Sequence, residues 1–348
     1  MIKISPITKR RIESFLKIKR AWISLIILAS VYFISLFSEF IANDKPIVIR
    51  YEGRYYFFAA FKFYSDIEFG GKYKTEAQYK EIAKTDRFTQ NPKNFMIFPP
   101  IPYSPYSSNL EDLEGFPPTP PDLKHILGTD DRGRDVFTRL LYGFRVSMTF
   151  SIILLILEIA IGVFIGALQG YLGGVFDITS QRLIEILSSL PFLYIVILLG
   201  AVLGKGLATL IIVMGIFNWI GLSYYIRAEF LKLKQLQYVE AARAIGMNPL
   251  AILFSEMLPN ALTPIVTFAP FSLIGGVSAL SSLDYLGFGL PAPTPSWGEL
   301  IKQGTEYLSC YWLSVYPFVA LFMTLLLTAF VGEGTREAID PKSYSKIE

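Results

Sequence analysis

Six segments of mostly apolar residues divide this chain, and each is long enough to cross a lipid bilayer as a helix. A spanning helix needs about 20 such residues. Main-chain polar groups find no water inside a bilayer, so an isolated spanning segment must satisfy them within a helix. Hydrophobic residues make up 52% of the 348 residues, and charged residues only 18%. The sequence therefore predicts an all-α polytopic membrane protein with helices at about 21–42, 147–170, 183–203, 207–226, 263–283 and 313–331.

The segments between these spans predict the rest of the organisation. The third and fourth spans are separated only by Gly204, Lys205 and Gly206, which predicts a tight hairpin. The full predicted order is a basic tail at 1–20, the first span at 21–42, a large insert at 43–145, a five-helix core at 146–331 with a polar loop at about 227–262, and a tail at 332–348.

Lysine and arginine in short flanking segments predict the orientation, because they accumulate on the cytoplasmic side. Fifteen of them lie in the two tails and in the loops that follow the second and fourth spans, against only Lys205 and Lys302 on the other side. Both termini and the 227–262 loop are therefore expected in the cytoplasm and the insert outside. The basic start also fits a signal peptide, but its apolar run is long for one and no small-x-small site follows. An uncleaved first span is expected.

Composition excludes several classes of chemistry. A single cysteine, Cys310, rules out an intramolecular disulfide, and a single histidine, His125, rules out paired-histidine metal sites. His125 is interpreted as a solvated or locally bonded side chain. The chain has no Gly-x-x-x-x-Gly-Lys-Ser/Thr sequence, so it does not bind ATP by that route. A membrane enzyme is therefore the least favoured class.

The 43–145 insert changes character along its length. Its first half is rich in aromatic residues, from Tyr51 to Tyr64, which predicts short strands or an aromatic cap. Its second half contains nine prolines between Pro92 and Pro121, which predicts extended rather than helical chain. Two interpretations stay open: a docking surface or lid for an external partner, and a collar that covers the outer helix ends.

The cytoplasmic loop contains the most informative motif. Glu240, Ala241 and Ala242 are followed by Gly246 and, further on, by Leu258-Pro259. Adjacent alanines permit close approach of a partner, and the glycine permits a turn. This pattern resembles the EAA loop of binding-protein-dependent ABC importer permeases, the loop that docks onto the ATPase subunits. One residue departs from the family pattern: Glu256 stands where an apolar residue is usual, three before the proline.

Two further motifs agree with that resemblance. The first is Gly128-Thr129-Asp130-Asp131-Arg132-Gly133-Arg134-Asp135. It is similar to the Gly-Thr-Asp-x-x-Gly-Arg-Asp signature before the second span of dipeptide and oligopeptide permeases. Its acids also suggest a calcium loop or an Asp/Arg-bonded turn. Residues 281–291 and 295–300 are similar to the segment after the fifth span in the same class. The chain thus resembles the C-type permease subunit of peptide ABC importers. The insert and Tyr171-Leu172-Gly173-Gly174 resemble the Yej-type subfamily most, which is associated with oligopeptides and microcin C.

The resemblance implies a type I importer fold and a set of partners. The chain would form a pathway for peptides or peptide-like compounds with a second permease subunit, as a heterodimer. ATP and magnesium would bind one fused or two separate ATPase subunits, not this chain. An external substrate-binding protein would deliver the substrate at a bacterial plasma membrane. A helix at about 238–245 would couple ATP hydrolysis to transport, with the Ala241–Ala242 face entering a groove on the ATPase. Glu240 would either accept a hydrogen bond from a basic or main-chain donor in that groove or stabilise the first turn of its own helix.

The spans themselves suggest a transport pathway. Helix-breaking residues lie in two spans: Pro191 in the third, and Pro264, Pro270, Gly275 and Gly276 in the fifth. They predict broken or thinned helices, which are tolerated beside protein or a water-filled cavity. The third and fifth spans are therefore candidates to line the pathway. Ordinary packing by small residues is an equally open interpretation.

Glu158 is an acid in the middle of the second span, where charge is costly and often functional. It is interpreted as a contact for a peptide amine or a neighbouring basic group, or as a protonated side chain hydrogen-bonded within the bundle. A proton-coupled secondary transporter that uses Glu158 is the alternative function, although the chain shows no convincing inverted repeat. An ATP-dependent exporter permease is disfavoured by the EAA pattern and the insert.

Overall fold

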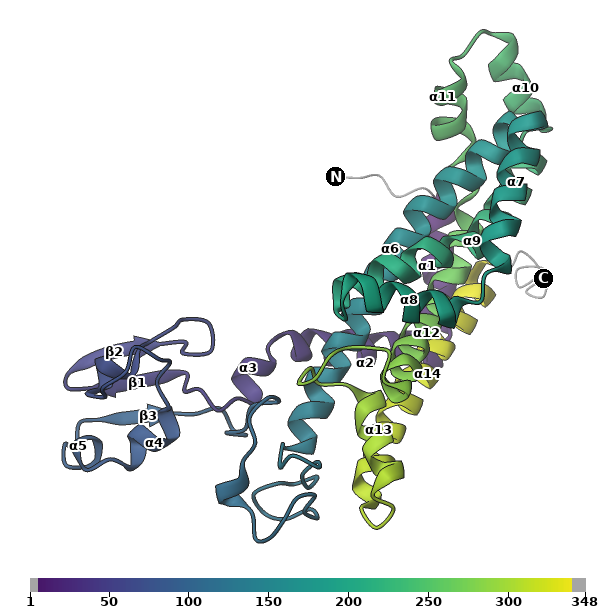
Figure 1. Ribbon diagram of the computed structural model, residues 1–348. Coiled ribbons are helices and arrows are strands. Elements are labelled where there is room, and N and C mark those ends of the chain that lie inside the picture. Colours follow the sequence, from purple (N-terminus) through teal and green to yellow (C-terminus); the bar gives the residue numbers. More distant parts are fainter. Residues whose placement is uncertain (1–5, 340–348) are drawn as a thin grey trace. The chain divides into compact units, whose positions relative to one another are not determined.

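Long apolar helices dominate the computed structural model, which describes residues 6–339 (Figure 1). Within these described residues, five helices are long and apolar enough to cross a membrane: α2 (Lys19–Leu36), α6 (Val136–Leu172), α9 (Leu207–Leu233), α12 (Leu262–Leu286) and α14 (Tyr311–Ile339). A sixth span is formed by α7 (Gly174–Ser189) and α8 (Phe192–Leu203) if this bent pair counts as one. The predicted all-α polytopic fold is confirmed.

The bend between α7 and α8 lies at Pro191. The two helices meet at an angle of 80°, and Pro191 occupies the position directly before α8. Proline has no amide hydrogen and disfavours helical conformation in the residue before it, so a helix ends there. The predicted break in the third span is thus confirmed, and α8 and α9 form the expected hairpin around residues 204–206.

The predicted break in the fifth span is wrong. Helix α12 runs without interruption through Pro270 and both glycines. Pro264 lies in its first turn, where an amide hydrogen has no helical partner in any case. At Pro270 the ring removes one main-chain hydrogen bond, a loss that neighbouring helices make tolerable in a membrane. A Cβ at position 276 would lie 2.8 Å from Ser151 Oγ, so Gly276 permits close packing of α12 on α6.

The helix ends differ from the hydropathy boundaries. Helix α6 begins 11 residues before the apolar segment does, and α14 continues to Ile339, into the predicted 332–348 tail. The basic start of the chain contains a helix, α1 (Pro6–Lys17), and the first apolar segment continues after α2 as α3 (Ser38–Ile41). The parts of the two tails at 1–5 and 340–348 lie outside the described residues.

Contacts divide the chain into two units, which are described separately. The first unit comprises residues up to 30, 147–291 and from 321 onward, and the second comprises residues 31–146 and 292–320.

In the first unit, α6 and α9 touch along three glycines spaced four residues apart. A Cβ at Gly162 would lie 2.9 Å from the carbonyl oxygen of Trp219, and one at Gly166 would lie 2.6 Å from that of Ser223. At Gly170 it would lie 2.5 Å from Phe230 Cβ. Small residues at this spacing let membrane helices approach main chain to main chain.

The second unit contains the insert, whose first half forms a small sheet with its own core. Strands β1 (Val48–Tyr51), β2 (Arg54–Phe57) and β3 (Phe95–Ile97) form an antiparallel sheet in the order β2-β1-β3. Short helices pack against this sheet: η1 (Asp66–Phe69), α4 (Tyr79–Lys84) and α5 (Asp86–Thr89). A further short helix, η2 (Leu110–Asp112), follows later in the chain. One sheet face packs on Phe69, Tyr79 and Phe88. The predicted short strands are confirmed, and the prolines from 92 to 121 all lie outside helices and strands.

The same unit contains the last short helix, α13 (Trp297–Glu306), which begins beside the start of α6. Ser296 caps it by accepting a hydrogen bond from the amide of Glu299 at 3.3 Å.

Candidate functional site

The loop between α9 and α12 contains a short amphipathic helix at the predicted place. Helix α10 spans Gln237–Ala244, within one residue of the expected 238–245. Gly246 follows with a φ of +80°, a left-handed conformation that favours glycine. The amide of Gly246 donates to the carbonyl of Arg243 and that of Met247 to Ala242, which closes the last turn. The expected turn at Gly246 is therefore confirmed.

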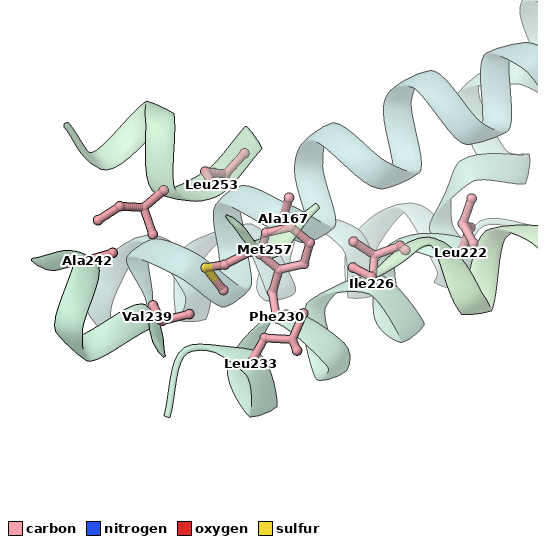
Figure 2. Close-up of a cluster of buried hydrophobic side chains, with 11 residues drawn as sticks. Ala167, Leu222, Ile226, Phe230, Leu233, Val239, Ala242, Leu253 and Met257 are labelled. Atoms are coloured by element: carbon pink, nitrogen blue, oxygen red, sulfur yellow. The ribbon is translucent and has the colours of Figure 1, made fainter. Parts of the chain in front are cut away.

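The inner face of α10 is packed against its own chain. Val239 and Ala242 are buried in a cluster with residues from α6, α9 and the following segment (Figure 2). The cluster comprises Ala167, Leu222, Ile226, Phe230, Leu233, Val239, Ala242, Ile252, Leu253, Met257 and Ala261. This packing fixes the helix on the ends of α6 and α9.

The two alanines of the motif point to different sides, which corrects the prediction of a single docking face. Ala241 is exposed, whereas Ala242 is buried in the cluster. Successive residues on a helix differ by about 100° in direction, so neighbours cannot share one face. Ala242 therefore serves close packing within this chain, and only Ala241 remains open to a partner.

The outward face combines one acid with apolar side chains. Glu240 is exposed in the first turn of α10, where a negative charge is favourable. Beyond it, Ile245 is 79% exposed and Leu250 is 60% exposed. Large apolar side chains exposed on a polar loop indicate a contact surface for another protein. We call Glu240, Ala241, Ile245 and Leu250 the outer face of the loop.

The second half of the loop explains how Glu256 is accommodated. After α11 (Pro249–Ala251), which Asn248 caps, the chain forms a π-helical segment, η3 (Ile252–Met257). Leu253 and Met257 fill the buried positions, while Glu256 is half-buried beside Ser255. Leu258 packs against the cluster and Pro259 is exposed. The acid thus stays outside the apolar cluster.

Two contacts near this loop were not predicted from the sequence. The guanidinium of Arg243 lies 5.3 Å from the centre of the Tyr171 ring, joining α10 to the end of α6. Arg227 on α9 donates two hydrogen bonds of 2.6 Å to the carboxylate of Asp177 on α7. The planar guanidinium fits a carboxylate in this way, which fixes both partners. Arg182 also pairs with Glu185 within α7, at 2.5 Å.

The intramembrane acid is buried and bonded within the helix bundle. Glu158 on α6 accepts a hydrogen bond of 2.9 Å from Ser272 Oγ on α12. The interpretation of a hydrogen-bonded side chain is confirmed. Pro270 lies two residues before Ser272 and is close to Gly332 of α14. Gly276 packs closely against Ser151, whereas a Cβ added at Gly275 would meet no atom within 4 Å.

In the second unit, the two motifs at 128–135 and 295–300 meet in a buried ion network. Arg134 Nε donates to Asp130 Oδ2 at 2.6 Å, and Arg134 Nη2 donates to Glu299 Oε1 at 3.1 Å. Arg139 pairs with the other oxygen of Glu299. Both arginines are almost fully buried. The network joins segments 165 residues apart in sequence.

Neighbouring residues extend this network. His125 is fully buried, and its Nδ1 lies 2.9 Å from Asp135 Oδ2. The locally bonded interpretation of His125 is therefore confirmed and the solvated one is wrong. Burial and the adjacent Asp130 raise the pKa of the Asp131 carboxyl. The acids of the 128–135 segment serve an Asp/Arg-bonded turn, because Asp130 accepts from Arg134 and from the amide of Arg132.

Comparison with known proteins identifies the family. Residues 141–343 match the family described as "Binding-protein-dependent transport system inner membrane component". The chain belongs to this family. It is 39% identical over 341 residues to the inner membrane ABC transporter permease protein YejE of Escherichia coli strain K12, covering 98% of this chain and 99% of that one.

Two further sequence relatives agree with membership of this family. The peptidoglycan transport system permease protein YejE of Agrobacterium fabrum is 40% identical over 362 residues, with 97% and 94% of the two chains covered. The dipeptide permease DppC of Bacillus subtilis is 37% identical over 226 residues, covering 64% of this chain and 70% of its own. A solved structure of the MetNI methionine transporter has a TM-score of 0.48 at 19% identity, covering 59% of this chain and 98% of that one.

The two YejE matches confirm the resemblance to Yej-type permeases, and the alignment with the Escherichia coli protein extends over the insert. The chain is a permease subunit of an ABC importer and a multi-pass inner membrane protein.

Proposed function

We propose that this permease conducts peptides or peptide-like compounds and is driven by partner ATPases that engage the outer face of its α9–α12 loop. The substrate class comes from its relatives, which include dipeptide and oligopeptide permeases. A second permease would complete the pathway as a heterodimer, and an external binding protein would deliver the substrate. ATP and magnesium would bind the ATPase subunits, in one fused or two separate chains.

The observation that carries the coupling role is the division of α10 into a packed and an open face. Val239 and Ala242 fasten the helix to α6 and α9, while Glu240, Ala241 and Ile245 are free to enter a groove on another protein. A force on the open face would therefore pass into α9 and α6 through close-packed side chains. Rigid-body movement of packed helices is a common way for such a force to open one side of a pathway. We place the ends of the segment that moves with the ATPase at Gly246 and at Leu258-Pro259.

The orientation follows from the charge distribution. We place both termini and the loop in the cytoplasm of a bacterial cell, with the 43–145 insert outside. The pathway is proposed to run beside α8 and α12, with Glu158 near it and with Pro191, Pro270, Gly275 and Gly276 shaping its wall. A proton-coupled carrier is not proposed, because family membership places the chain with binding-protein-dependent systems.

The test is the complete complex, purified with its partners and reconstituted in proteoliposomes. Glu240→Arg reverses the charge on the outer face and should lower ATP-dependent uptake at least tenfold while the permease remains folded. Gln237→Arg, at the exposed start of the same helix, is the matched control and should retain most uptake. Recovery of a second permease and a P-loop ATPase in the preparation is also expected. Normal uptake by the Glu240→Arg complex would overturn the assignment of this face.

A further inference from the structure

The three-stranded sheet of the insert has one face that its own core leaves uncovered. Ile49 and Tyr51 of β1, with Tyr56 and Met96, point into the core. Alternate residues point the other way. Pairing places Val48 beside Phe57 and Ile97, and Arg50 beside Tyr55 and Phe95. Tyr55, Phe57, Phe95 and Ile97 are all exposed. A face with five apolar or aromatic side chains and one cation is unusual beside water.

The same apolar surface continues from the sheet to the first membrane span. Tyr55 stacks on Phe57 with 6.1 Å between ring centres, and Phe57 lies 6.4 Å from Phe58. Phe40 in α3 contacts both Phe58 and Phe61, at 5.9 and 5.8 Å. The series then passes through Phe37 to Phe33 at the end of α2. We call these seven rings the aromatic ridge: Phe33, Phe37, Phe40, Tyr55, Phe57, Phe58 and Phe61.

The position of the ridge along the first span corresponds to a membrane surface. Helix α2 has 18 residues and so rises about 27 Å, close to the ~30 Å thickness of a hydrocarbon core. Directly after it, Glu39 forms an ion pair of 2.9 Å with Arg145, the last basic residue of α6. Charges at this point mark the end of the apolar region. Phe40, next to Glu39, lies at the same level.

The backbone at Phe58 indicates that its orientation is maintained at a cost. Its φ is +54°, a conformation that side chains other than glycine rarely adopt. The amide of Phe58 donates to the carbonyl of Ile47, and its carbonyl accepts from the amide of Lys62. This turn directs Phe58 and Phe61 toward Phe40 and away from the core.

We propose that the aromatic ridge and the open sheet face lie in the headgroup region of the lipid bilayer, so that the insert rests on the membrane. Tyrosine concentrates at this depth, and exposed phenylalanines of surface-bound segments insert to the boundary between headgroups and acyl chains. The surface also carries a cation, because Arg50 lies over the exposed Tyr55 ring at 5.3 Å. Its charge suits a lipid phosphate. The surface is continuous with a membrane span, which favours lipid over a soluble protein as its occupant.

Spin labelling tests this placement in the assembled transporter in lipid nanodiscs. The chain has one cysteine, which is buried, so Cys310→Ser gives a background for single labels. Labels are placed at 57 and 61, and at Lys84 on α4, whose Tyr79 and Ile82 pack on the covered side of the sheet. Power saturation then compares collision with oxygen, which enters lipid, and with a water-soluble nickel chelate.

The proposal predicts a several-fold higher ratio of oxygen to nickel collisions at 57 and 61 than at 84. Equal ratios at all three sites would place the sheet face in water and overturn the proposal. Labels at 57 and 61 that are immobilised and protected from both reagents would show that a protein subunit covers the face, which would also overturn it. Uptake by each labelled complex, measured in parallel, separates these outcomes from any failure of coupling.

Discussion

At the scale of single residues, the ion network of the second unit shows how charge is made tolerable in a buried position. Arg134 and Arg139 are nearly inaccessible to solvent, and Asp130 and Glu299 supply the opposing charges. Arg139 also donates to the carbonyls of Pro105 and Pro293. Such a network is weak evidence for net stability, but removal of one partner leaves buried charges uncompensated. Its role is to fix the segments around residues 130 and 299 to one another.

Glu299→Gln should therefore destabilise the permease strongly. The substitution keeps the shape but removes one of the two carboxylates, Asp130 and Glu299, that both arginines share, at a cost of about 3 kcal/mol by analogy with other broken buried pairs. Thermal unfolding of the detergent-solubilised protein, followed by intrinsic fluorescence, should show a clear decrease in midpoint. Glu114→Gln, at an exposed position of the same unit, is the control and should leave the midpoint unchanged. A midpoint for Glu299→Gln equal to that of the control would contradict the network's structural role.

At the scale of elements, apolar length predicted the helices well and their ends poorly. Span positions follow from hydropathy because each apolar segment has few alternatives in a bilayer. Helix α6 begins at Val136 rather than at 147, since its first residues are held by the network at Arg139 and not by lipid. The effects of prolines were predicted only in part: Pro191 separates two helices, while Pro270 remains within one. Proline chemistry is the same at both positions, and the packing of neighbouring helices decides the outcome.

The loop helix α10 illustrates a second limit of sequence. The helix and its glycine turn were predicted from the motif, but the division of the two alanines was not. Which face is covered depends on Phe230, Leu253 and Met257, and their arrangement is set by tertiary structure.

Substituting each alanine separately should reveal this division. Ala242→Gln places a polar side chain in a close-packed cluster and should lower the unfolding midpoint, with an overpacking cost of about 1–3 kcal/mol plus the burial of an amide. Ala241→Gln should leave the midpoint unchanged and reduce ATP-dependent uptake in the reconstituted complex, because it alters only the outer face. Both properties are measured on the same preparations. Equal effects of the two substitutions on stability would mean that the alanines share one environment.

At the scale of the whole molecule, the family and the span pattern could be predicted from sequence, and the long-range contacts could not. The motifs at 128–135 and 295–300 were recognised, yet nothing in either segment indicates that Arg134 reaches Glu299. The strand order of the insert could not be predicted either, because alternating aromatic residues indicate strands without fixing how they pair. The orientation across the membrane rests on counted charges.

Cysteine labelling should establish this orientation. In the Cys310→Ser background, Leu123→Cys and Ile245→Cys introduce reactive groups at two strongly exposed positions. A membrane-impermeant maleimide added to intact spheroplasts should modify position 123 at once and position 245 only after the membrane is permeabilised. Labelling of 245 before permeabilisation would reverse the assigned topology and remove the loop from contact with cytoplasmic ATPases.

The glycines at 162 and 166 have a consequence for genetics. The nearest atoms to a new Cβ at these positions are the main-chain carbonyl oxygens of Trp219 and Ser223. Those oxygens are present whichever amino acid occupies α9, so no exchange of the facing side chain can restore the lost space. A selection for second-site revertants of Gly166→Val should therefore return true revertants or changes elsewhere in the helix bundle, and none at position 223.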